Sequence, residues 1–459
     1  MRRALPATVI AIGILVIAAL LLYNRSADTD IRSQLYVPKN SRITPEINLL
    51  RAYVRIDTSN PPGREMAGAR FLADLLERHG LQAEIIESAP GRANVYARLK
   101  GKRRGEGLLL LNHIDVVPAT SAGWFRPPFG GAIALNQLWG RGSLDMKSIA
   151  LCELEGLFAA ARRGQPQRDI VFLGVADEEE GGVYGTQWLL RHRPDIFEGV
   201  RYALNEGGIT ETRQEKLSYF GVEIGTKMSV SVQLRASSRE QMQRVRLSLE
   251  PYLSPRDPDR ILPEVREYLH DIAPQRVEHR VLLDDIDRTL AAGKFWLLAP
   301  GYKELMQNVV FLGGVKPDAT MDVNLYNLPD EDPDRRIAWL QSRVAPLGVK
   351  IDSVLSKNGP APLTSRHTAL FNLIEREVHN AYGSVPVGTE ILAASSNDSR
   401  FLRARGILCY GLWPFPVDFY QTQGIHSTNE RIRIDWYMQG VSLMKRLIPG
   451  YAFDQGPMT

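Results

Sequence analysis

The feature that most constrains this chain is a buried strand that ends in ionisable residues. The segment LLLLNHIDVVP, residues 108–118, is apolar for four residues and then presents Asn112, His113 and Asp115. Buried strands avoid ionisable groups unless a partner compensates their charge. Residues two apart on a strand share a face, so His113 and Asp115 point the same way. They form either a paired His and Asp within the core or a metal ligand with a supporting carboxylate.

Composition limits the partners that such a strand can have. The chain has 459 residues, which predicts two domains or one domain with a large insertion. Its net charge of +4, without a basic run interleaved with aromatic residues, gives no reason to expect nucleic acid as a partner. The two cysteines, Cys152 and Cys409, lie in apolar runs and are too few for a disulfide framework. A metal site would therefore use His and carboxylate ligands.

The first residues predict a membrane anchor. Arg2 and Arg3 precede an apolar run, and no charged residue follows until Arg25. About 20 apolar residues span a bilayer as a helix, and the end of this run suits signal-peptide cleavage poorly. We expect a single-pass signal anchor at 4–23 and a tether at 24–43. The flanking arginines favour a cytoplasmic N-terminus, which places the body outside the cytoplasm, in the periplasm, outside the cell or in a lumen.

The body of the chain has the pattern of an α/β protein. Short apolar runs alternate with amphipathic segments, which predicts a mixed sheet with helices on both faces. We expect helices at about 65–79, 146–163 and 184–192, and strands at about 82–88, 93–99, 107–112, 169–176 and 201–205.

The pattern changes after about residue 225. Residues 227–236 and 319–328 alternate apolar and polar side chains, as half-exposed antiparallel strands do. A charged, proline-containing helical region lies between them, and the α/β pattern returns from about residue 368. We therefore predict a catalytic domain in two parts, interrupted by an α+β lid or dimerisation domain. The predicted boundaries are 44–224, 225–345 and 346–459.

Four further segments carry potential metal ligands. Asp145 precedes a helix, where an Asp is usually an N-cap. Four acids at 177–180 follow a strand and precede two glycines, and Glu206 stands in a similar position. His426 lies in the segment QGIHSTNER. Any of these residues could be structural, but open α/β sheets place ligand sites at the carboxyl ends of strands, and together the segments predict a metal centre.

In these segments the chain resembles the co-catalytic zinc hydrolases, which include aminoacylase, glutamate carboxypeptidase, carboxypeptidase S and succinyl-diaminopimelate desuccinylase. The carboxypeptidase S branch fits best. The matching segments are DTSNPPG, NHIDVVP, WFRPPFGG, LWGRGSLDMK, DEEEGG, NEGG, NDSRF and HSTNER.

The resemblance implies a set of ligands for two zinc ions, with Co²⁺ or Mn²⁺ as alternatives. His113, Asp145 and Glu206 would hold one ion. Asp145, Glu179 and His426 would hold the other, so that Asp145 bridges the pair.

The resemblance also implies a reaction. Glu178 would be the general base and Asp115 would orient His113. A water shared by the two ions would hydrolyse an amide bond in a small peptide or an N-acyl amino acid. The zinc-exopeptidase-like fold would carry this site, and the lid would support a homodimer.

The lid departs from the family pattern at two places. The strand before Ser237 lacks the usual His, and His270 or His279 could replace it or lie on the surface. Tyr326 stands where the family has an Arg that binds the substrate carboxylate, and Tyr lacks the bidentate fork of Arg.

These departures leave Asp398 and Arg400 as the predicted substrate contacts, with a purely structural role as the alternative for Arg400. Three functions agree with this pattern. The first is an amide hydrolase with a changed substrate, for example one without a free α-carboxylate. The second is a membrane-tethered binding or regulatory protein on a hydrolase scaffold. The third is an esterase or deacetylase with the same centre. Retention of Glu178 favours an enzyme, because binding alone needs no base.

Overall fold

The computed structural model describes residues 42–208, 210–213, 216–253, 255–392, 396–417 and 419–456. The predicted anchor at 4–23 and nearly all of the predicted tether at 24–43 lie outside these ranges. Among the helices within them, none is both long and apolar enough to cross a membrane.

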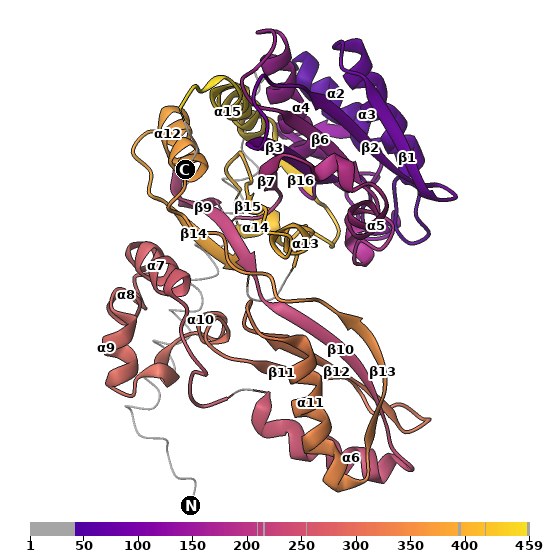
Figure 1. Cartoon of the computed structure of the whole chain (residues 1–459), viewed down its shortest axis with the longest axis vertical. Coiled ribbons are helices and arrows are strands. Elements are labelled where there is room, and N and C mark those ends of the chain that lie inside the picture. The colour runs from indigo at the N-terminus through magenta and orange to yellow at the C-terminus, as the bar shows by residue number, and fades with distance from the viewer. Residues whose placement is uncertain are drawn as a thin grey trace, which may run out of the picture.

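A nine-stranded mixed sheet forms the core of the upper part of the molecule in Figure 1. Its strands run in the order β1-β2-β6-β3-β7-β15-β9-β14, and β8 pairs with β9. The pairs β6–β3, β3–β7 and β7–β15 are parallel, whereas β1–β2 and β2–β6 are antiparallel. The predicted mixed sheet is therefore confirmed. The strands are β1 Ala83–Ala89, β2 Arg92–Leu99, β3 Gly107–His113, β6 Ile170–Val175, β7 Val200–Asn205, β8 Thr210–Arg213, β9 Lys216–Thr226, β14 Val387–Leu392 and β15 Leu408–Gly411.

Helices cover both faces of this sheet, as predicted. Leu108 and Leu110 of β3 belong to the core on one face, and Leu109 and Leu111 belong to the core on the other. Because side chains alternate along a strand, a strand covered on both faces must be apolar throughout. The first face carries α2 Pro45–Val54, α3 Glu65–Arg78, α4 Lys147–Ala161, α12 Ala369–Tyr382 and α15 Ile434–Phe453, and the second carries α5 Thr186–His192 and α13 Ser399–Arg403.

A small three-stranded sheet joins the two halves of the chain. β5 pairs on one side with β4 and on the other with β16, which comes almost 300 residues later. This pairing brings the loop that contains His426 beside the turn that precedes Asp145. The elements are β4 Ala132–Ala134, β5 Gln137–Trp139, α14 Phe419–Thr422 and β16 Arg431–Arg433.

A second sheet forms the lower part of the molecule in Figure 1, in the order β11-β12-β10-β13. Alternate side chains of β10, including Val230, Val232 and Leu234, enter a separate core. Helices α6 and α11 contribute to this core. The bounds are β10 Met228–Arg235, α6 Arg239–Leu249, β11 Val309–Leu312, β12 Thr320–Asn327, α11 Pro333–Val344 and β13 Lys350–Lys357.

A helical block lies beside the large sheet rather than on the second one. Val265 and Leu269 of α7 belong to the core of the large sheet, and Figure 1 shows α7 near β9 and β14. The prediction assigned all of 225–345 to one lid, but residues of this range enter two different cores, and the second sheet extends to Lys357. The block comprises α7 Pro263–Ile272, α8 Arg280–Leu283, α9 Ile286–Ala291 and α10 Pro300–Glu304.

Candidate metal centre and active site

The candidate ligands lie at the carboxyl ends of three neighbouring strands. His113 ends β3, Glu178 and Glu179 lie in the 3₁₀ turn that follows β6, and Glu206 follows β7 directly. β3 lies between β6 and β7 in the sheet, and both pairs are parallel. Their carboxyl ends therefore meet at one edge, where open α/β sheets bind ligands.

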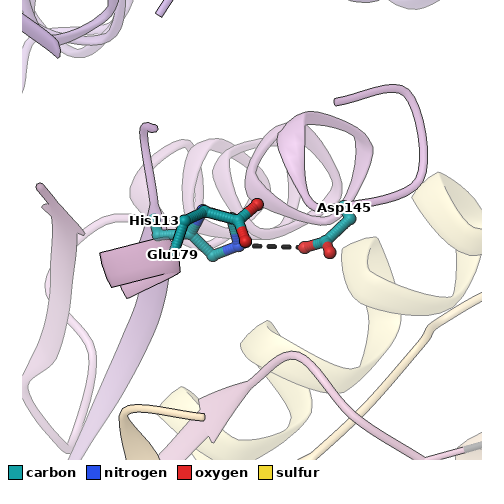
Figure 2. Close-up of side chains that lie close together, drawn as sticks. All are labelled: His113, Asp145 and Glu179. Atoms are coloured by element: carbon teal, nitrogen blue, oxygen red, sulfur yellow. Dashed lines mark hydrogen bonds and ion pairs between the residues drawn. The ribbon is translucent and has the colours of Figure 1, made fainter. Parts of the chain in front are cut away.

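Asp145 lies between two imidazole rings. Its Oδ1 is 3.0 Å from Nε2 of His113, as Figure 2 shows, and its Oδ2 is 3.1 Å from Nε2 of His426. His426 Nε2 is also 2.9 Å from Oε2 of Glu179, and His113 Nε2 is 3.8 Å from Oε2 of Glu206. The structure therefore brings all five predicted ligands together around one carboxylate that faces both imidazoles.

The donor atoms fit a divalent metal. One ligand atom each from His113, Asp145 and Glu179 lies within 4.8 Å of the others, and the same holds for His113, Glu178 and Glu206. Imidazole nitrogens and carboxylate oxygens are the usual zinc ligands besides cysteine. Glu178 lies as near to His113 and Glu206 as a ligand would, so distance alone does not separate a base from a ligand at this position.

Asp115 positions both His113 and the loop that carries the glutamates. Nδ1 of His113 lies 2.8 Å from the main-chain oxygen of Asp115 and 3.6 Å from its Oδ1. The Asp115 carboxylate accepts the N–H groups of Glu178 at 3.1 Å and Glu179 at 3.2 Å. The sequence analysis predicts that Asp115 orients His113, and the main-chain oxygen of Asp115 is the nearer of the two acceptors. With Nδ1 donating, Nε2 of the neutral ring is free to bind a metal.

Behind Asp115 lies a buried polar network to which sequence reasoning gave no role. The Asn60 side-chain amide donates to Asp115 at 2.9 Å and to Asp177 at 3.0 Å. Arg92 binds Asp177 at 2.6 Å and Glu65 at 2.7 Å. Asn60 belongs to the matching segment DTSNPPG, so a signal was present in the sequence.

Glu430 is a second residue to which the sequence analysis gave no role. Its fully buried carboxylate accepts the N–H groups of Gly142, Leu144 and Asp145 at 2.7–3.1 Å and pairs with Arg141 at 2.7 Å. It therefore fixes the turn that carries Asp145. The available signal was its place in the segment HSTNER, four residues after His426.

The pKa values show a centre with excess negative charge. Burial, followed by the charge of Glu206, raises the pKa of Glu178 well above its ordinary value. Burial and the charge of Asp145 raise the pKa of Glu206 to about 7. Hydrogen bonds to Asp145 and Glu179 raise the pKa of His426 to about 10. Without a metal, these groups retain protons near neutral pH because too little positive charge is present.

A cavity of about 320 Å³ opens beside the ligands. One part of its wall is polar and carries four carboxylates and an imidazole, and another part is apolar. Its lining consists of Asp145, Glu178, Glu179, Glu206, Gly207, Gly208, Leu392, Ser396, Asn397, Trp413, Thr422, Ile425 and His426.

The predicted substrate contacts lie behind this wall. Asp398 accepts a hydrogen bond from the Thr186 hydroxyl at 2.6 Å, and its side chain is buried. Arg400 is 7% exposed, and its guanidinium lies 4.4 Å from the Phe401 ring centre. Neither residue lines the cavity, although Ser396 and Asn397 before them do.

The lid histidines and Tyr326 also lie away from the cavity lining. His270 is exposed on α7, where its Nδ1 lies 3.1 Å from the Asp284 main-chain oxygen. The His279 ring lies 5.8 Å from the ring of Tyr302. Tyr326 packs edge-on against Phe311 across β11 and β12. Among the described residues, therefore, none of the three completes the site in this arrangement.

The sequence and the fold are similar to those of known proteins. The chain is 23% identical over 361 residues to an N-fatty-acyl-amino acid synthase/hydrolase of Xenopus tropicalis, covering 71% of this chain and 68% of the relative. It is 24% identical over 388 residues to a carboxypeptidase S-like protein of Dictyostelium discoideum, covering 74% of this chain and 71% of the relative.

A solved structure has the same fold. A metallo-carboxypeptidase of the M20 family from Sulfolobus solfataricus superposes with a TM-score of 0.69 at 16% identity, covering 89% of this chain and all of that one. The sequence pattern of peptidase family M20/M25/M40 matches residues 109–449, which include each predicted metal ligand. The predicted family relationship is thereby confirmed, and the chain is a hydrolytic enzyme that belongs to peptidase family M20/M25/M40.

Proposed function

We propose that this enzyme hydrolyses amide bonds at a centre of two divalent metal ions, with Glu178 as general base. The observation that carries the proposal is the position of Asp145 between the imidazoles of His113 and His426, at 3.0 and 3.1 Å. A carboxylate whose two oxygens face two histidines is suited to bridge two ions.

The ligands divide into two sets. His113 and Glu206 lie on the Oδ1 side of Asp145, and Glu179 and His426 lie on its Oδ2 side. Zinc suits these nitrogen and oxygen donors, and Co²⁺ or Mn²⁺ could occupy the same positions. When bound, such ions supply Lewis acidity toward a water molecule and toward a carbonyl oxygen.

Glu178 is the remaining carboxylate of the cavity. Its main-chain N–H is held by Asp115, so its position depends on the same residue that holds His113. A carboxylate with a raised pKa is suited to take a proton from the attacking water and to return it to the leaving amine. The described lining contains no Cys, and its Ser396 hydroxyl accepts a hydrogen bond from Arg400, which favours direct attack by water.

The substrate class follows from the size of the cavity and from the relatives. A cavity of about 320 Å³ suits a small molecule rather than a folded protein. The Xenopus relative is named for N-fatty-acyl amino acids and the Dictyostelium relative for carboxypeptidase S. We infer that the substrate is a small peptide or an N-acyl amino acid derivative.

We also propose where the enzyme acts. The apolar run at 4–23 supports a membrane anchor with the hydrolase body outside the cytoplasm. The edge strand β13 supports pairing of two copies through the second sheet, because Val354 and Leu355 are exposed on it.

The decisive experiment is Glu178→Gln. We expect the variant to keep its bound metal, measured by elemental analysis of the purified protein. Its kcat should fall by about 10²–10⁴-fold, because general-base catalysis contributes that much.

Glu180→Gln is the matched control, because Glu180 is an exposed acid of the same turn. It should keep both metal and activity. Loss of metal in Glu178→Gln would instead make Glu178 a ligand, and unchanged activity would place the base elsewhere.

A further inference from the structure

The side chains that line the cavity carry more negative than positive charge. Asp145, Glu178, Glu179 and Glu206 contribute four negative charges, and no Lys or Arg occurs among the described lining residues.

Two divalent ions would balance these four charges and leave the cavity formally neutral. A substrate carboxylate would then add a negative charge that no Lys or Arg of the described lining receives. Burying an unpaired carboxylate is strongly unfavourable, and proteins that bind carboxylates in closed sites usually supply a bidentate Arg.

Two of the nearby buried arginines, Arg141 and Arg403, are ion-paired, whereas Arg400 forms no ion pair with a described residue and its buried Nε has no hydrogen-bond partner among them. Arg141 binds Glu430 at 2.7 Å, and both amino groups of Arg403 bind Glu223 at 2.8 Å. Arg400 lies behind the wall, where it donates to the Ser396 hydroxyl and stacks on Phe401. Moving any of these groups into the cavity would break an existing contact.

Three apolar side chains also line the cavity. Leu392 ends β14, Trp413 follows β15 and is 8% exposed, and Ile425 directly precedes the ligand His426. These side chains come from three separate segments and line the same cavity. They provide a surface that an uncharged group can cover, with release of water.

Resting on the proposed function, we propose that this cavity selects amides whose amine portion is uncharged and apolar, and that it disfavours a free α-carboxylate there. Three compounds test this selectivity. They are N-acetyl-L-leucine, N-acetyl-L-leucinamide and N-(3-methylbutyl)acetamide, which share the acyl group and the branched chain. Each releases acetate when hydrolysed, so one assay measures all three.

We expect kcat/KM for both uncharged compounds to exceed that for the acid by about tenfold or more, since the acid leaves a carboxylate unpaired. Calorimetric binding to the zinc-loaded Glu178→Gln variant should show the same order of affinity without turnover.

A substitution designed to reverse the preference for uncharged substrates provides a second test. Leu392→Arg should raise the acid-to-amide ratio of kcat/KM by about tenfold, because it supplies the cation that the lining lacks. Leu392→Gln, the uncharged control of similar reach, should leave the ratio unchanged.

The outcomes separate this inference from the proposed function. Preference for the acid, lost in Arg400→Met, would overturn the inference and make Arg400 the carboxylate anchor. Bound metal with neither hydrolysis nor binding of any compound would also overturn it. Absence of bound metal together with absence of acetate release would overturn the proposed function and the inference with it.

Discussion

Glu430 shows how much of the centre depends on residues that do not face the cavity. Its carboxylate holds three main-chain N–H groups in the turn that ends at Asp145. Asp145 in turn lies between the two histidines. A shift of that turn would move the central carboxylate away from both ligand sets at once.

We therefore predict that Glu430→Gln weakens metal binding by about 10–100-fold, as loss of an outer hydrogen-bond partner does in other metal sites. The amide keeps the shape but cannot accept every N–H or pair with Arg141. Competition with a chelator measures the change. Asp435→Asn, which removes another acid paired with an Arg nearby, should leave the affinity unchanged. Equal affinities for Glu430→Gln and the wild-type chain would show that the turn holds its position without Glu430.

The protonation of the ligands predicts a pH dependence of metal binding. In the metal-free protein, the pKa of Glu206 is raised to about 7 and that of His426 to about 10. Both groups must lose a proton to bind a cation, and this loss becomes easier as the pH rises.

Metal affinity should therefore increase from pH 6 to pH 8, by about tenfold per unit for each proton released. Chelator competition at three pH values measures the slope. An affinity that is flat over this range would contradict protonated ligands in the metal-free state.

At the scale of elements, α4 and α15 form the main packing layer on one face of the large sheet. Most residues of α4 are buried, so α4 is a core helix and has no broad polar face of the kind that an amphipathic helix exposes to solvent. Gly156 permits the close approach of α15. A Cβ at this position would lie 2.6 Å from the Met444 main-chain oxygen and 2.4 Å from Ile448 Cδ1.

We predict that Gly156→Ala lowers the free energy of unfolding by about 1–3 kcal/mol and that Gly156→Leu lowers it further, because the added atoms overpack this contact. Thermal unfolding of both variants measures the series. No loss in Gly156→Leu would mean that α15 can shift without cost.

Most elements of the large sheet could be predicted from periodicity. The strand predicted at 169–176 is β6, Ile170–Val175, and the helix predicted at 146–163 is α4, Lys147–Ala161. Both segments are apolar runs bounded by polar residues, a pattern that can be recognised in the local sequence without knowledge of tertiary contacts. His113 and Glu206 follow apolar runs directly, but the full ligand set, with Asp145 and His426, could be named only through the resemblance to the zinc hydrolases.

The packing of the helical block could not be predicted in this way. Helix α7 has an ordinary amphipathic pattern, with Val265, Leu269 and Ile272 buried. That pattern shows that one face is covered, but not by which sheet. The role of Glu430 could not be predicted for a related reason: its hydrogen-bond partners lie more than 280 residues away in the chain. Local patterns carry no information about such distant pairs.

For the whole molecule, the apolar N-terminal run predicts membrane association. The full chain should sediment with membranes after cell lysis, and a chain that begins at residue 42 should remain in the supernatant with its hydrolase activity intact. The described ranges contain three hydrophobic cores and the candidate ligands, so we expect the shorter chain to keep what catalysis needs. Release of the full chain by high salt alone would contradict a spanning helix.

The small sheet that joins β5 to β16 has a consequence for synthesis of the chain. A ribosome that has released only the first 400 residues has made His113, Asp145, Glu179 and Glu206, but not His426 or Glu430. The nascent protein would then carry a cluster of acids without its second imidazole and without the carboxylate that fixes the Asp145 turn. The second sheet, whose strands and helices lie within residues 228–357, contains its own core and has no such dependence. The metal centre is therefore among the last parts of this molecule that can form, and a chain stopped early would carry a folded lid beside an unfinished enzyme.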